Sequence, residues 1–182
     1  MRLAAILLAA GRSQRFGTED KLLATYKGRP LVSHAADAIR ALRPTSMIAV
    51  LSSEAVATLL PDFQRSCPKP GLPQSASLIA GVKAALSARA DKALIVLGDM
   101  PNVTPALLKE LVKRADDDHA TAATDGQTSQ PPVCFPRGML GKLLDSSGDQ
   151  GARELITMLP TSQLVHTSVQ ELKDVDEQID LT

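Results

Sequence analysis

The sequence predicts an open, mostly parallel α/β sheet in three layers, with helices on both faces, built as a single domain over residues 1–182. Apolar runs alternate with segments of helical periodicity along the chain, which is typical of this fold class. Two of these runs, Leu3–Ala9 and Ala93–Leu97, are continuously apolar, as expected for strands buried on both faces. A chain of 182 residues also buries roughly 70% of the surface that it exposes when unfolded. This is enough for a stable hydrophobic core without disulfides or a structural metal.

Helix signals fix the elements of the first half. Leu31, Ala35 and Ile39 recur at helical spacing, and Pro30 suits the first helical position. Ser53 is a candidate N-cap for the next helix. In order, the expected elements are the strand Leu3–Ala9, the helix Pro30–Leu42, the strand Met47–Leu51, the helix Ser53–Leu60, the helix Ser75–Arg89 and the strand Ala93–Leu97.

In the second half, Thr104 is the expected N-cap and Pro105 the first residue of a helix that runs to Ala115. The three Asp residues of 116–118 follow it, and we interpret them as the solvated exit of the helix rather than as metal ligands. The remaining expected elements are the strand Ala120–Thr124, the polar turn Asp125–Gln130, the strand Val133–Phe135, the helices Leu140–Leu144 and Ala152–Leu159, the edge strand Leu164–Val165 and a last turn or helix over Val175–Leu181.

Composition limits the class of protein. The 20 Lys and Arg residues balance 20 Asp and Glu, and aromatics make up 2% of the chain, so we expect no nucleic-acid partner. No run of 18 apolar residues is present, so we expect no membrane span.

Cys67 and Cys134 form no disulfide framework, and we expect both to be reduced and buried, in a cytoplasmic protein. Residues 1–10 imitate a secretion signal, but a short run followed at once by a glycine loop favours a first strand.

The loop Ala10–Lys21 combines small residues with the cations Arg12, Arg15 and Lys21. Small residues let a backbone approach a ligand, and clustered cations suit a polyphosphate. The spacing matches neither GxGxxG nor GxxxxGK[ST], so this is neither a dinucleotide fingerprint nor a Walker loop. A solvated basic loop explains the same residues equally well, and the spacing alone leaves both interpretations open.

A carboxylate, Asp99, directly follows the second buried strand in the run Gly98-Asp99-Met100-Pro101. In open α/β sheets ligands bind beyond the carboxyl ends of the strands, and Mg²⁺ prefers oxygen ligands and phosphate partners. The competing interpretation, that Asp99 caps the following helix, is weakened because Thr104 already offers that cap. An acidic and a cationic segment at neighbouring strand ends indicate a site for a metal–nucleoside triphosphate.

The motifs of the chain sharpen this hypothesis. The segment Leu8–Leu23 closely resembles LAAGxSxRFGxxxKLL, the signature of the MobA-like nucleotidyltransferases, and within them it is most similar to the molybdenum cofactor cytidylyltransferases. Five further motifs of that family occur in the same order: Gly28–Leu31, Ser75–Leu78 with Gly81, Gly98–Pro101, Gly148–Arg153, and Asp174–Asp176 with Asp180 and Leu181.

This resemblance implies a Rossmann-like nucleotidyltransferase fold and Mg²⁺-dependent transfer of CMP from CTP to the phosphate of molybdopterin, with a molybdoenzyme as a possible receiver of the product. It also implies roles for individual residues. Lys21, Arg15 and Asp99 are the expected catalytic residues, and Asp99 and Asp176 the expected metal ligands. Gly151 and Arg153 would face the acceptor. The expected nucleotide-binding residues are Leu8, Ala9, Ala10, Gly11, Arg12, Ser13, Arg15, Lys21, Ser75 and Ser77.

The pair Ala9-Ala10 bears on the base. In the resembled family LAAG accompanies cytidylyl transfer and LAGG guanylyl transfer, and a Cβ at residue 10 would crowd a purine. Two departures from the pattern, at Pro73-Gln74 and at Pro131, keep a different acceptor open, such as a sugar or polyol phosphate. Transfer from GTP, and a non-catalytic role as a chaperone for the cofactor, also stay open at this point.

Overall fold

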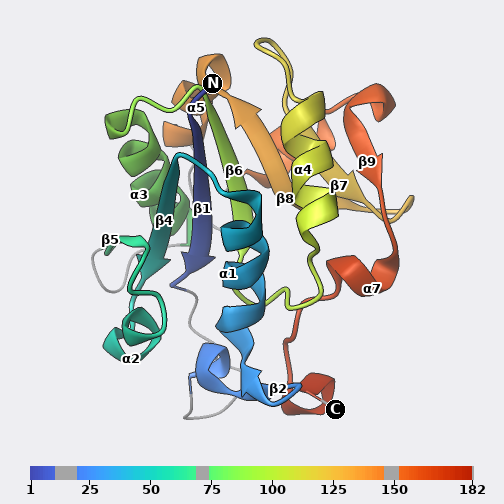
Figure 1. Ribbon diagram of the computed structural model, residues 1–182. Coiled ribbons are helices and arrows are strands. Elements are labelled where there is room, and N and C mark those ends of the chain that lie inside the picture. Colours follow the sequence, from blue (N-terminus) through green and yellow to red (C-terminus); the bar gives the residue numbers. More distant parts are fainter. Residues whose placement is uncertain (11–19, 69–73, 146–151, 182) are drawn as a thin grey trace.

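A seven-stranded sheet forms the middle layer of the protein (Figure 1). The structure is a computed structural model that describes residues 1–10, 20–68, 74–145 and 152–181. The strands are β1 (Leu3–Ala9), β4 (Ser46–Leu51), β5 (Gln64–Ser66), β6 (Lys92–Leu97), β7 (Thr121–Thr124), β8 (Ser129–Pro136) and β9 (Leu164–His166). Their spatial order is β5-β4-β1-β6-β8-β7-β9. Of these seven, only β8 runs antiparallel to its neighbours, so the predicted mostly parallel sheet is confirmed.

Helices cover both faces of this sheet, which gives the predicted three layers (Figure 1). One face is covered by α1 (Leu31–Leu42), α2 (Glu54–Thr58), α4 (Pro105–Arg114) and α7 (Val169–Leu172). The other face is covered by α3 (Gln74–Ser87), α5 (Arg137–Leu144) and α6 (Arg153–Thr157). The predicted N-caps of two helices are confirmed, because Ser53 Oγ accepts from Val56 N and Thr104 Oγ1 accepts from Leu107 N.

Strand β1 shows why its sequence is apolar throughout. Its residues alternate between the two faces of the sheet, as the period of a strand requires. Leu7 packs into the core under α1 and α4, and Ile6 packs into the core under α3. Because helices cover both faces, every residue of the strand except the partly buried Leu8 is buried, and the strand has no polar position.

Helix α3 lies unusually close to the sheet at Gly81. A Cβ added to this glycine would lie 2.6 Å from Ile6 Cγ2 and 3.1 Å from Val50 Cγ2. The missing side chain therefore allows the helix to sit directly on β1 and β4.

We expect Gly81→Ala to lower the free energy of unfolding by about 1–3 kcal/mol, because the new methyl group overpacks a closed core. Gly141→Ala in α5 is the matched control, since nothing lies within 4 Å of its added Cβ. There the same change favours the helix, and we expect equal or higher stability. Urea denaturation of both variants checks this; a Gly81→Ala protein as stable as Gly141→Ala would contradict the close approach of α3.

The prediction for β8 is wrong in extent. The strand spans Ser129–Pro136 rather than Val133–Phe135, and the expected turn at 125–130 loses its last two residues to it. Pro131 and Pro132 lie where the register with β7 shifts, between the pairs Ala122–Val133 and Ala123–Gln130. Prolines are tolerated in strands at such irregular positions, where no ladder hydrogen bond is needed from them.

Other corrections concern short elements and element ends. Pro30 precedes α1 at the N-cap position and closes a two-stranded hairpin that was not predicted, formed by β2 (Thr25–Tyr26) and β3 (Arg29–Pro30). Strand β5 and helix α7 were also not predicted, because three or four residues carry too little periodicity. α5 begins three residues before its prediction, α6 is shorter than its prediction at both ends, and the last turn is a 3₁₀ helix, η3 (Gln178–Leu181).

Both cysteines are free, but only one is buried. Burial raises the pKa of the Cys134 thiol to about 12, which keeps it protonated. Cys67 is exposed, so the prediction that both are buried is wrong for this residue.

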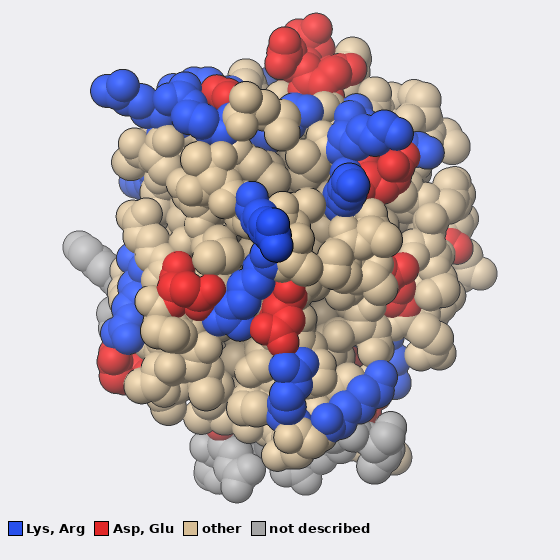
Figure 2. All heavy atoms as spheres, viewed as in Figure 1, with Lys and Arg blue, Asp and Glu red and all other residues tan. Residues whose placement is uncertain are grey.

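Lys, Arg, Asp and Glu side chains are interspersed over the face that carries α1 and α4 (Figure 2). Among the described helices, none is long and apolar enough to span a membrane.

Candidate active site

The candidate site lies where β1 and β6 end, at the lower edge of the sheet in Figure 1. These neighbours are parallel, with Leu8 opposite Leu97, so the two chains leave the sheet side by side. Gly98 N donates to Leu8 O at 2.9 Å and extends the pairing by one residue. The chain after Ala9 and the chain that carries Asp99 therefore leave the sheet next to each other.

Gly98 lies in a tight contact that leaves little room for a side chain. An added Cβ would lie 3.3 Å from Ala9 Cβ, 3.3 Å from Leu8 O and 3.4 Å from Leu22 Cδ2. Leu22 belongs to η1 (Lys21–Leu23), a 3₁₀ helix whose N-cap, Asp20, accepts from Leu22 N. The close packing at Gly98 brings η1 against the end of β6, and with it the side chain of Lys21.

Lys21 is the positive centre of the site. Its Nζ lies 2.9 Å from Asp99 Oδ2 and 3.3 Å from Asp176 Oδ1, and its side chain is only 10% exposed. Burial by itself would lower the pKa of Lys21, but the charges and hydrogen bonds of Asp99 and Asp176 outweigh it and raise the pKa. The ammonium is therefore fully charged at neutral pH. Asp99 and Asp176 follow Lys21 in the chain by 78 and 155 positions, and the fold brings all three together here.

Three carboxylates share the site. Asp99, Asp174 and Asp176 each offer one oxygen, and these oxygens lie within 4.8 Å of one another. Burial, followed by the charges of Asp176 and Asp99, raises the pKa of Asp174. Carboxylate oxygens at this separation need only a small contraction to bind one Mg²⁺, whose ligands lie at about 2.0–2.1 Å. The donor set thus fits a hard divalent cation.

The C-terminal segment presents its two carboxylates by alternation. Asp174 and Asp176 belong to the cluster, while Val175 between them is 2% exposed and packs with Tyr26 and Leu31 on the other side. Val175 N donates to Asp99 O at 2.9 Å, which joins the two segments that carry the carboxylates. Asp174 was not among the predicted site residues; its place two residues before Asp176 in an extended segment is the signal that indicates it.

We expect Val175→Ala to weaken divalent cation binding by several-fold without removing any ligand. The smaller side chain loosens the contact with Tyr26 and Leu31, so Asp174 and Asp176 are held less rigidly. Mn²⁺ titration followed by EPR measures the change. Val169→Ala, at a side chain that is 62% exposed, is the control and should match the wild type. Equal Mn²⁺ affinity in both variants would contradict the role of Val175.

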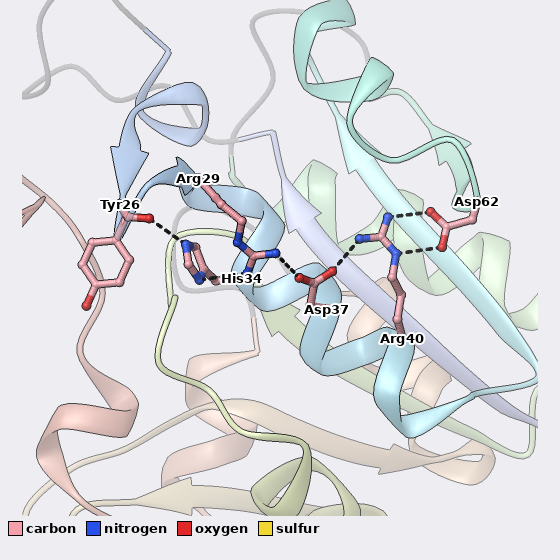
Figure 3. A network of polar contacts seen from close by, with 6 residues as sticks. All are labelled: Tyr26, Arg29, His34, Asp37, Arg40 and Asp62. Carbon is pink, nitrogen blue, oxygen red and sulfur yellow. Dashed lines mark hydrogen bonds and ion pairs between the residues drawn. The ribbon is translucent and has the colours of Figure 1, made fainter.

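A chain of polar contacts holds the hairpin next to this segment (Figure 3). His34 Nε2 lies 2.8 Å from Tyr26 O, and Arg29 donates to Asp37 at 2.7 Å, so α1 binds both hairpin strands. The chain continues through Arg40 to Asp62, which precedes β5; the contacts of Arg40 are 2.9 Å to Asp37 and 2.6 Å to Asp62. The hairpin that carries Tyr26 is thus fixed to the helix layer, and Tyr26 in turn contacts Val175.

The structure brings together three of the predicted site residues, Lys21, Asp99 and Asp176. Ala9 is buried at the end of β1, and Leu8 and Ala10 beside it are partly buried. Ser75 (buried) and Ser77 (partly buried) lie in the first turn of α3, and Arg153 is the exposed first residue of α6. The predicted residues Gly11, Arg12, Ser13, Arg15 and Gly151 lie outside the described residues.

The competing role for Asp99, as a helix cap, is not what the structure shows. Thr104 caps α4, and the Asp99 carboxylate binds Lys21 instead. Met100 is 1% exposed in the core, so it serves packing. The departure at Pro73-Gln74 falls where the structure does not describe the side chains.

A family model, the MobA-like NTP transferase domain, matches residues 5–167, which include most of β1 as well as Lys21 and Asp99. The chain belongs to the MobA-like NTP transferase family. Two curated relatives are a molybdenum cofactor guanylyltransferase of Pseudomonas putida, 30% identical over 97% of this chain and 90% of that protein, and a probable molybdenum cofactor guanylyltransferase of Pyrococcus horikoshii, 30% identical over 79% of this chain. The chain spans 66% of the Pyrococcus protein's length.

Among solved structures, this MobA-like transferase is similar to a nucleotidyl transferase from Methanothermobacter, with a TM-score of 0.84, 25% identity, and coverage of 98% of this chain and 94% of that one. The predicted fold and the nucleotidyltransferase class are thereby confirmed. Both curated relatives carry the name guanylyltransferase, whereas the sequence motifs favour cytidylyl transfer. The family is shown, and the choice of nucleotide is a separate question.

Proposed function

We propose that this MobA-like transferase moves CMP from CTP to the terminal phosphate of molybdopterin or the molybdenum cofactor. A phosphate oxygen of the acceptor attacks the α-phosphorus, the bond from the α-phosphorus to the bridging oxygen breaks, and pyrophosphate leaves. The reaction needs no nucleophile from the protein, so positioning and charge stabilisation carry the catalysis. The observation that supports it most is the meeting of Lys21, Asp99 and Asp176 at the end of β6.

Each group has a task in this reaction. Lys21 is a charged donor on a short 3₁₀ helix beside the end of β1, where the expected phosphate loop begins. It stabilises the negative charge that develops on the α-phosphate in the transition state. Asp99, Asp174 and Asp176 are the residues that would hold Mg²⁺. When bound there, the cation neutralises phosphate charge and orients the triphosphate. Arg15 at the β- and γ-phosphates, and Gly151 with Arg153 at the acceptor, complete the proposal.

The choice of CTP depends on Ala10. This residue is partly buried directly after β1, so its Cβ can limit the space next to a bound base. We expect Ala10→Gly to raise kcat/KM for GTP relative to CTP by about 10-fold or more, because one steric group in a pocket changes discrimination by about 1–3 kcal/mol. The ratio of the two kcat/KM values cancels any general loss of activity. An unchanged ratio would remove Ala10 from base selection.

GTP is the second candidate, and one observation favours it. Both curated relatives are named guanylyltransferases, and the identity to the Pseudomonas protein extends over 97% of this chain. The mechanism proposed above is the same for either nucleotide. A different acceptor, such as a sugar or polyol phosphate, would also leave the nucleotide side unchanged. A non-catalytic chaperone is disfavoured, because it has no use for Lys21 facing a carboxylate cluster.

Pyrophosphate release from CTP and from GTP, with Mg²⁺ and with or without molybdenum cofactor, tests the proposal. Release from CTP that requires the cofactor is the expected result. Cofactor-dependent release from GTP would keep the reaction and replace the nucleotide. No release from either nucleotide would contradict the proposed reaction and turn attention to another acceptor.

A further inference from the structure

We propose that Lys21 is an internal cation that competes with the divalent metal for Asp99 and Asp176, so that metal binding displaces its ammonium toward the nucleotide phosphates. This inference deepens the proposed function and depends on it, since the displaced ammonium needs a phosphate to receive it. Lys21 then has two positions, one on the carboxylates and one on the substrate.

The first position follows from the contacts. Lys21 Nζ donates to Asp99 Oδ2 at 2.9 Å and to Asp176 Oδ1 at 3.3 Å. Both oxygens belong to residues of the cluster whose ligand atoms lie within 4.8 Å of one another. A magnesium ion bound by these carboxylates at about 2.0–2.1 Å would therefore lie next to the ammonium. Two cations this close repel each other, with partial screening by water because Asp174 and Asp176 are exposed.

Charge explains why the ammonium occupies this position. Asp99, Asp174 and Asp176 bring three carboxylates together, and Lys21 supplies a positive charge that is bonded directly to two of them. The lysine side chain is only 10% exposed, so water compensates it poorly and the carboxylates are its partners. Moving the ammonium away is unfavourable unless another cation replaces it and another anion accepts it.

A metal ion and a triphosphate meet these two conditions together. The metal replaces the ammonium on the carboxylates, and the phosphates accept the ammonium. Binding of metal and nucleotide is then positively coupled through Lys21, and such coupling is reciprocal. Without nucleotide the protein binds metal weakly, because the metal must first displace Lys21. The catalytic position of the ammonium is thus reached when metal and nucleotide are both bound.

Mn²⁺ binding to the nucleotide-free protein, measured by EPR, tests the competition. We expect Lys21→Met, which keeps the length and removes the charge, to bind Mn²⁺ about 10-fold more tightly than the wild type. Lys173→Met is the matched control, because it removes a charge next to Asp174 from a lysine that pairs with Asp180 outside the cluster. Its Mn²⁺ affinity should change by much less than that of Lys21→Met. Equal or weaker binding in Lys21→Met would overturn the proposal.

A measurement on the wild type keeps the proposal testable if Lys21→Met unfolds. Lysine acylation followed by mass spectrometry reports access to each amino group. Lys21 should be protected without metal and become reactive at saturating Mn²⁺, while the exposed Lys109 should react equally in both states. Continued protection of Lys21 under Mn²⁺ would overturn the displacement. Neither experiment measures turnover. A failed transfer assay would therefore contradict the proposed function without deciding whether Lys21 competes with the metal.

Discussion

Asp99→Asn is expected to lower metal-dependent turnover by about 10³-fold, the largest effect of any single change in the site. Asp99 contributes to the carboxylate cluster and binds Lys21, so its charge serves both the metal and the ammonium. Loss of charge stabilisation worth several kcal/mol in the transition state corresponds to a factor of this size. The fold should survive, because Val175 N bonds to the main-chain oxygen of Asp99 and not to its side chain.

Asp118→Asn is the matched control for this change, because Asp118 is an exposed carboxylate in the turn after α4 and outside the cluster. Steady-state pyrophosphate release, measured over a range of Mg²⁺ concentrations, separates the two variants. Asp118→Asn should be as active as the wild type. If the turnover of Asp99→Asn equals that of Asp118→Asn over the whole range of Mg²⁺ concentrations, Asp99 has no part in the metal site.

Lys21→Ala is expected to lower kcat by about 10²–10³-fold while changing the Kd of the nucleotide by much less. A group that acts mainly on charge developing in the transition state affects kcat more than ground-state binding. The Kd should be measured at saturating Mn²⁺, because the variant is also expected to bind metal more tightly. Lys27→Ala, on the exposed hairpin turn, is the control.

The distribution of the loss between kcat and Kd decides the role of Lys21. If the Kd rises by the same factor by which kcat/KM falls, Lys21 serves ground-state binding alone. If neither quantity changes, the ammonium has no part in the reaction. Isothermal titration with a non-hydrolysable nucleotide gives the Kd, and pyrophosphate release gives kcat.

The sequence predicted the parts of the fold that depend on local patterns. β1 and β6 were found because helices cover both faces of the sheet there, which leaves continuous apolar runs. The caps Ser53 and Thr104 were found because their function is local. The predicted β8 was too short because its two prolines are typical strand breakers, and the register shift that accommodates them depends on β7, which no local pattern shows.

In the candidate site too, the sequence indicates individual residues but not the contacts that depend on tertiary packing. Lys21 could be named from its cationic loop and Asp99 from its place directly after a buried strand, whereas Asp176 was indicated by a family motif alone. Their mutual contacts could not be predicted, because they depend on how η1, the end of β6 and the C-terminal segment pack around Gly98. Asp174 was not recognised as a site residue, since its contribution depends on the extended course of residues 174–176 past Asp99.

Label transfer from CTP tests the central claim most directly. With [α-³²P]CTP, Mg²⁺ and molybdenum cofactor, we expect the label to move into a nucleotide adduct of the cofactor. With [γ-³²P]CTP, the label should appear in pyrophosphate. Transfer of the γ label to the cofactor, or its release as inorganic phosphate, would contradict nucleotidyl transfer and show a kinase or hydrolase instead.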